Sequence, residues 1–289
     1  MKTLLLFGAL TFGLNSFGQT NNYSLEYDGV DDYVNCISNL PDSSNSLTVC
    51  AWVNVASYSN GYGKIFDLKS GASRITLQSI AANTGLGFQV QSLPIGQVGV
   101  VLPNFNVSNN WFYLTGKWTD STISLYVNGS LVVESPQTLI NEVYFSDTAN
   151  IFHFGAKIDT INHFHGLIDD ISFWSYSLDS LEIQQYMNCP PTGSEQGLVG
   201  YWNFEEGTGI STNDLTSNGN DGTLLNGVTW STNVPSYTCD LGIDEVLHSE
   251  KELVMIIDFM GRETEFKPNT PLIFIYSDGS RERVMKLEE

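Results

Sequence analysis

The chain of 289 residues carries 12 Lys and Arg against 32 Asp and Glu, a formal net charge of -20. A chain with this balance repels phosphate backbones and anionic lipid, which excludes a nucleic-acid binder. Hydrophobic residues make up 42% of the chain, enough for a packed core, whereas charged residues make up 15%, below the roughly 25% of typical globular chains. The composition favours an exported, turn-rich β protein.

Residues 1–18 are typical of a secretory signal peptide. Lys2 precedes an apolar run from Leu4 to Leu14, and Ser16 and Gly18 are small residues suited to cleavage after Gly18. The apolar run is shorter than the roughly 20 residues that cross a bilayer, and no later segment is longer, so we expect no membrane span. We therefore expect a secreted protein, either extracellular or on the cell surface; the alternative is that the run forms a buried first strand.

Apolar residues recur with a period of two in two stretches: Leu47, Val49, Ala51, Val53 and Val55, and then Ile123, Leu125 and Val127. Such alternation predicts half-buried strands. Dipeptides that tolerate the positive φ of hairpin turns occur at Asp28-Gly29, Asn60-Gly61, Asn128-Gly129, Asn218-Gly219, Asp221-Gly222 and Asn226-Gly227. Together they predict an all-β protein, an antiparallel sandwich or jelly roll.

One helix is predicted, over residues 179–187. Asp179 precedes its first turn and Glu182 follows three residues later, the spacing of a capping box. We expect this helix to close the first module.

The end of the chain is predicted to form a separate small β module, residues 241–289. Six of the 12 Lys and Arg lie in this part of the chain, which places a boundary near residues 239–244. Apolar stretches predict strands over 253–259 and 272–276 and a last strand that ends at Leu287. A module this small is hard to stabilise alone, so it docks or folds on a partner.

The four cysteines predict disulfides in an exported protein, and four cysteines allow three pairings. Proximity in the sequence favours Cys36 with Cys50 and Cys189 with Cys239. No Cys-x-x-Cys spacing supports a structural zinc.

Four segments in order resemble the laminin G-like members of the concanavalin A-like lectin/glucanase superfamily. They are 27–34 (YDGVDDYV), 47–53 (LTVCAWV), 111–113 (WFY) with 123–129 (ISLYVNG), and 164–174 (FHGLIDDISFW). The resemblance implies a concanavalin A-like jelly roll over residues 19–240, with the main sandwich in 23–188.

The family segment similar to 197–207 (GLVGYWNFEEG) usually precedes the first of these strands, whereas here it follows the helix. Because the ends of a jelly roll tend to lie close together, residues 197–230 can add strands to the same sandwich as a circular permutation. The alternative is an abortive second repeat that packs loosely outside.

The tail resembles the C-terminal sorting domains of the type IX secretion pathway. The matching parts are the strand 253–257, residues 258–263 (DFMGRE), Pro271, residues 275–279 (IYSDG) and Lys286. The resemblance implies the type IX secretion machinery as a partner; an ordinary small β appendage is the alternative.

Catalytic residues are not expected. Hydrolytic relatives of this fold alternate two carboxylates on one strand, near Glu-x-Asp-x-x-Glu, so that one residue protonates the glycosidic oxygen. The nearest match, residues 26–31 (EYDGVD), has Asp in place of the acid/base Glu and Gly in the strand.

The acidic residues instead predict a structural Ca²⁺. Alternation places Asp169 on one strand face with Leu167, Ile171 and Phe173, so its carboxylate is expected to point inward. A buried carboxylate needs partners, and oxygen ligands suit Ca²⁺.

Members of the family often carry such a calcium, which implicates Asp169 or Asp170 together with Asp28 and Asp31 of the opening turn. The alternative is that these aspartates accept hydrogen bonds from nearby backbone amides. Three neighbouring histidines, His153, His163 and His165, could hold zinc; the alternative is the packing role that strand-face histidines more commonly have.

The expected function is non-catalytic binding of a glycan or another cell-surface ligand by the sandwich. A protein-binding adhesin and a glycoside hydrolase of the same fold are the alternatives. The ligand-binding residues are not identified by the sequence.

Overall fold

The computed structural model describes residues 21–37, 39–57, 61–80, 84–106, 109–145, 150–159, 161–237, 239, 253–258, 261–277 and 281–284. The predicted signal peptide, residues 1–18, lies outside the described residues. The chain forms two compact units, Met1–Cys239 and Asp240–Glu289.

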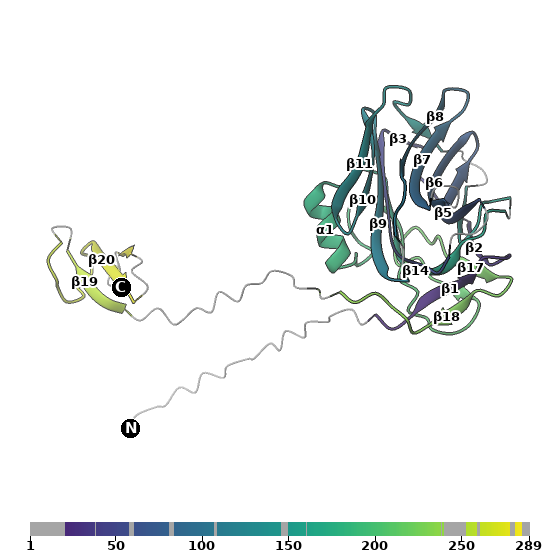
Figure 1. The fold of residues 1–289 in the computed structure, drawn as a ribbon. Helices are drawn as coiled ribbons and strands as arrows, with labels where there is room; N and C mark the ends of the chain where they lie inside the picture. The colour runs from purple at the N-terminus through teal and green to yellow at the C-terminus, as the bar shows by residue number, and fades with distance from the viewer. Residues whose placement is uncertain are drawn as a thin grey trace. The chain divides into compact units, whose positions relative to one another are not determined.

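The first unit is an antiparallel sandwich of two large sheets (Figure 1). Sheet A contains β1 (Ser24–Asp28), β4 (Ser46–Val55), β9 (Trp111–Thr119), β10 (Thr122–Val127), β11 (Ser130–Pro136), β14 (His165–Trp174), β15 (Leu198–Trp202) and β18 (Thr229–Ser231). Its order is β11-β10-β9-β4-β14-β1-β18, and β15 pairs with the second half of β14. The predicted all-β jelly roll is confirmed.

Sheet B contains β2 (Tyr33–Ile37), β5 (Tyr62–Ser70), β6 (Ser73–Ile80), β7 (Gly85–Ser92), β8 (Gly96–Leu102), β13 (Ile151–Phe154), β16 (Ser211–Thr212) and β17 (Gly222–Leu225). Its order is β16-β17-β2-β13-β5-β6-β7-β8. Two short strands, β3 (Ser43–Ser44) and β12 (Val143–Tyr144), pair with each other outside both sheets.

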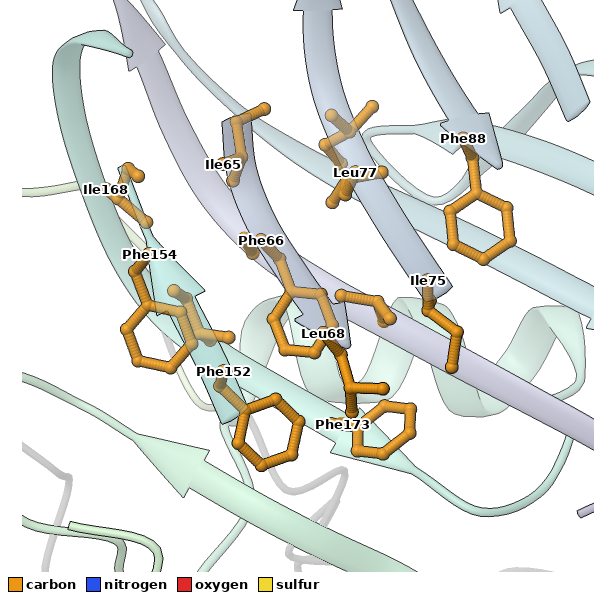
Figure 2. Close-up of a cluster of buried hydrophobic side chains, with 14 of the residues drawn as sticks. Ile65, Phe66, Leu68, Ile75, Leu77, Phe88, Phe152, Phe154, Ile168 and Phe173 are labelled. Atoms are coloured by element: carbon orange, nitrogen blue, oxygen red, sulfur yellow. The ribbon is translucent and has the colours of Figure 1, made fainter. Parts of the chain in front are cut away.

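The core lies between the two sheets. In β4 the predicted alternation holds, because Leu47 and its alternate neighbours pack in the core whereas Cys50 and Trp52 face the opposite side. Figure 2 shows aromatic rings of both sheets meeting there. The ring centroids of Phe66 (β5) and Phe173 (β14) are 5.7 Å apart. Such edge and offset contacts add to the free energy of burying the rings.

Helix α1 (Ser180–Asn188) covers the outer face of sheet A (Figure 1). The capping box is confirmed: Asp179 accepts hydrogen bonds from the amides of Leu181 and Glu182, and Glu182 accepts one from the Asp179 amide. Ile183 is buried in the cluster on this face. Within the described part of the chain, no helix is both long enough and apolar enough to span a bilayer.

Residues 197–230 contribute strands to both sheets. In sheet A, β15 pairs with β14 and β18 pairs with β1; in sheet B, β17 pairs with β2 and β16 pairs with β17. Trp202 is fully buried, with its ring 4.8 Å from that of Phe154, and its indole nitrogen donates a hydrogen bond of 2.9 Å to the Asn220 carbonyl. The segment therefore packs as part of the sandwich and not as a loosely attached repeat.

One predicted disulfide is confirmed and the other is wrong. Cys189 and Cys239 are bonded. Cys36 and Cys50 are free and buried. Cys36 lies in the core between the sheets, whereas Cys50 lies on the outer face of sheet A, so the body of the sheet separates the two thiols.

The second unit is a three-stranded antiparallel sheet formed by β19 (Leu253–Ile257), β20 (Leu272–Tyr276) and β21 (Arg281–Val284). The small C-terminal β module is thus confirmed. Its first strand is shorter than predicted among the described residues, and residues 285–289 lie outside them.

Candidate functional site

A β-bulge in β14 decides where Asp169 and Asp170 lie. The register with β4 shifts between Asp169 and Ser172, and Asp170 has a positive φ of 46°. Because the bulge inserts a residue, Ile168 and Ile171 both reach the core between the sheets. The predicted inward direction of Asp169 is therefore wrong: both carboxylates lie on the outer side of sheet A.

Asp170 is held by two tyrosines. The hydroxyl of Tyr201 donates to its Oδ1 at 2.5 Å and that of Tyr237 to its Oδ2 at 2.8 Å. Burial raises the pKa of Asp170, and the two hydrogen bonds lower it. Burial has the larger effect, and the resulting pKa is about 6.

Asp169 is fully buried beside it. Burial and the adjacent Asp170 raise the pKa of Asp169. Its carboxylate accepts hydrogen bonds from the Asn21 amide group at 3.1 Å and from the Asp170 backbone N–H at 2.9 Å. The Asn21 Oδ1 atom is buried without a hydrogen-bond partner. Buried oxygens that lack hydrogen-bond donors can be satisfied by a hard cation such as Ca²⁺.

A second cluster of carboxylates lies in the turn after β1. Asp28, Asp31 and Asp32 each offer an oxygen within 4.8 Å of the others, the one such group of three among the described residues. Asp32 is only 2% exposed; its Oδ2 accepts from the Asp28 amide, and its Oδ1 has no partner. Burial raises the pKa of Asp32, so an additional positive charge would stabilise its ionised form.

The four predicted calcium ligands therefore do not form one site. Asp28 lies opposite His165 in the β1–β14 pairing, four residues along β14 from Asp169. Asp28 also accepts a hydrogen bond from the Val30 amide at 2.7 Å, the turn contact that we gave as the alternative. Sequence reasoning missed Asp32, although it directly follows Asp31.

The three histidines do not converge. His153 contacts Asn35 on sheet B at 3.0 Å, and His165 contacts Ser57 at 2.7 Å. His163 lies 3.4 Å from the Asp32 carbonyl. These separate contacts favour the packing role.

A pocket of about 660 Å³ opens beside α1, where β14 leads into the helix and the chain returns to β15. Its lining residues, here called the tyrosine pocket, are Ser175, Tyr176, Glu182, Tyr186, Glu195, Gln196 and Gly197. No sequence pattern indicates this pocket beyond the i, i+4 spacing of Glu182 and Tyr186, because residues from three separate segments line it.

Buried Trp174 orients both tyrosine rings of the pocket. The Tyr186 ring lies 4.6 Å from it at an interplanar angle of 32°, and the Tyr176 ring lies 5.8 Å from it, edge-on at 89°. The Tyr176 hydroxyl is fixed by a hydrogen bond of 2.9 Å to Glu182. The pocket thus presents two aromatic side chains in set directions.

The pocket also brings two carboxylates together, which we did not expect. Glu195 accepts hydrogen bonds from Thr192 and from the Gly193 amide, and these outweigh desolvation and lower its pKa. Glu182 accepts from Tyr176 and from the Asp179 amide. A glycosidase needs one acid with a raised pKa as proton donor, and the pKa of Glu195 moves the opposite way.

The two-layer antiparallel sandwich, with α1 as the one helix among the described residues, has the architecture of a jelly roll. Residues 28–184 match the laminin G-like family described as the concanavalin A-like lectin/glucanases superfamily, and the chain belongs to this family.

Many solved structures are similar to the chain, and two of them illustrate the likeness. A proposed carbohydrate-binding protein from Bacteroides ovatus is 20% identical with a TM-score of 0.58; the alignment covers 76% of this chain and 62% of that protein's length. The heptameric SAP-like pentraxin of Limulus polyphemus is 14% identical with a TM-score of 0.54; the alignment covers 76% of this chain and 98% of that chain. A search of curated proteins finds no match.

Proposed function

We propose that the protein is a secreted, non-catalytic carbohydrate-binding protein and that the tyrosine pocket holds a saccharide. The observation that carries the proposal is the pair of tyrosines oriented by Trp174 beside two carboxylates and an exposed amide. The resemblance in fold to a proposed carbohydrate-binding protein supports it.

The pocket has the groups that sugar recognition requires. The apolar C–H faces of a sugar ring pack on aromatic rings such as Tyr186, and sugar hydroxyls donate to carboxylates such as Glu182 and Glu195. Gln196 is exposed and offers both a donor and an acceptor. Since both carboxylates repel anions, this pocket favours neutral or amino sugars.

Two alternatives follow from particular features. Glu182 and Glu195 in one pocket would suit a glycoside hydrolase, and release of reducing sugar from a bound polysaccharide would support that reading over binding alone. A protein-binding adhesin would bind no glycan and would retain a partner through other surfaces.

A glycan array followed by calorimetric titration tests the proposal. We expect wild-type protein to bind a neutral or amino-sugar glycan. We expect Tyr186→Ala, which removes the ring on which the sugar packs, and Gln196→Ala, which changes an exposed side chain, to weaken that binding. Tyr62→Ala, on an exposed tyrosine of sheet B, is the matched control. Equal loss of affinity in the control and the pocket variants would reject the pocket as the site.

We also propose that Ca²⁺ stabilises the sandwich. Asp28, Asp31 and Asp32 would hold one ion, and Asp169 with Asn21 offers a second place for a cation. The unpaired oxygens of Asp32 and Asn21 support this fit. The ion would neutralise buried carboxylates and tie the first strand to its neighbours.

The proposed location is extracellular, in agreement with the disulfide of the first unit. We propose that residues 241–289 engage the type IX secretion machinery, on the basis of their resemblance to sorting domains. Deletion of this segment in a host that has the pathway would leave the sandwich inside the outer membrane, and normal release of the truncated protein would refute the assignment.

A further inference from the structure

The few cations of the first unit are not spread evenly. Residues 21–239 contain 20 Asp and Glu but only five Lys and Arg, namely Lys64, Lys69, Arg74, Lys117 and Lys157. Lys117 lies in β9 of sheet A, with its ammonium over the Tyr126 ring. The other four lie in or beside strands β5, β6 and β13 of sheet B.

The outer face of sheet B is polar across its width. Asn35, His153, Asp67, Thr76 and Gln89 lie directly opposite one another in a row across β2, β13, β5, β6 and β7. Their sequence neighbours, such as Phe88 and Phe152, fill the core between the sheets. Strand alternation therefore turns the polar row outward.

The cations flank this row. Lys69 lies directly opposite Arg74 across β5 and β6, and Arg74 lies opposite Gln91 of β7. Lys64 is buried nearby, and its ammonium donates a hydrogen bond to Gln78. We call Lys69, Arg74 and Lys157, with the neighbouring Gln89 and Gln91, the basic face.

Local carboxylates balance two of these three charges. Arg74 pairs with Asp67 through two hydrogen bonds, and Lys157 pairs with Asp159 at 2.8 Å. Lys69 is exposed and has no acidic partner among the described residues. The basic face thus keeps a net positive charge in a unit where acids outnumber bases fourfold, and an anion is attracted here and repelled elsewhere.

Asp67 orients the Arg74 guanidinium through two hydrogen bonds. It is fully buried, accepts from Thr76 at 2.8 Å and from the Ile158 amide at 3.0 Å, and so holds the guanidinium in a fixed direction. A guanidinium and an ammonium side by side suit a carboxylate, and the side-chain amides of Gln89 and Gln91 suit sugar hydroxyls.

We infer that the basic face is a second binding surface, separate from the tyrosine pocket, for saccharides that carry carboxylate groups, such as uronic acids. The tyrosine pocket has carboxylates of its own and lies beside α1 on the sheet A side. The two surfaces therefore favour sugars of different charge, and either proposal can be rejected while the other still holds.

Titration calorimetry with an oligogalacturonate and its methyl ester tests the inference. The two ligands differ in charge and share the sugar backbone. We expect the wild-type protein to bind the acid more tightly than the ester, and we expect added salt to weaken that binding. Lys69→Gln should weaken it roughly tenfold, the loss of one charge-assisted contact.

Lys117→Gln removes the same charge from sheet A and should leave the affinity unchanged. Tyr186→Ala should also leave it unchanged, which separates this surface from the proposed neutral-sugar site. Equal affinity for the acid and the ester, or equal weakening in Lys69→Gln and Lys117→Gln, would overturn the inference.

Discussion

The hydroxyl of Tyr201 in β15 donates a hydrogen bond of 2.5 Å to Oδ1 of Asp170, at the bulge of β14. The contact joins a residue of the late segment to the strand that pairs with β1 and β4. Both side chains are buried, so no solvent replaces either partner when the other is removed.

Tyr201→Phe should therefore destabilise the first unit. Loss of a charge-assisted hydrogen bond to a buried carboxylate lowers the free energy of unfolding by about 1.5–3 kcal/mol. Tyr144→Phe is the control, because Tyr144 also donates to a carboxylate, Glu142, but is 59% exposed. Urea unfolding should show a change within about 0.5 kcal/mol for the control. Equal losses in both variants would mean that burial of the contact is unimportant.

Reduction of the Cys189–Cys239 disulfide should lower the free energy of unfolding. The bond joins residues 50 positions apart, and the loss of loop-closure entropy in the unfolded chain corresponds to about 4 kcal/mol for a loop of this length. A Cys189→Ser, Cys239→Ser double variant should show that loss and no further response to reductant. Cys36→Ala, at a free cysteine, should keep the response to reductant.

Chelation should lower the melting temperature if Ca²⁺ occupies the carboxylate groups. Removal of a ligand that binds only the folded state destabilises that state in proportion to its saturation. Asp32→Asn and Asp169→Asn should each reduce the shift that EDTA causes, whereas Asp120→Asn, at an exposed turn, should not. An identical melting curve with and without EDTA would refute the calcium proposal.

Lys64 should make stability depend on alkaline pH. Burial lowers its pKa from 10.5 to about 8, so the folded protein releases this proton before the unfolded chain does. Below pH 8 both states are charged and the full burial cost applies; between pH 8 and 10.5 the cost disappears and stability from this group rises, by at most about 1.4 kcal/mol per pH unit.

The difference in unfolding free energy between wild type and Lys64→Met, measured from pH 7 to 9.5, checks this. It should shift in favour of the wild type as the pH rises. Lys69→Met, at an exposed lysine of the same strand, should show no such slope. Parallel curves for wild type and Lys64→Met would contradict the lowered pKa.

The accuracy of the sequence predictions depended on the range of the interactions involved. The capping box at Asp179 and Glu182 and the alternation from Leu47 to Val55 were predicted correctly. Each depends on backbone geometry within a few residues, which the residue types themselves reveal.

Predictions that needed two distant segments were less successful. The bulge at Asp170 reversed the expected direction of Asp169, and no local pattern signals where a bulge inserts its extra residue. The expected Cys36–Cys50 bond failed because nearness along the chain did not place the two thiols on one side of a sheet.

The sandwich, its family and the small second sheet could be predicted from the amino-acid sequence, since periodicity, turns and motifs are local properties repeated along the chain. The folded arrangement was needed to show which carboxylates meet, that Trp174 orients Tyr176 and Tyr186 into one pocket, and that Lys69 and Arg74 lie side by side. Sheet order and register set these neighbours, and both depend on packing of the whole core.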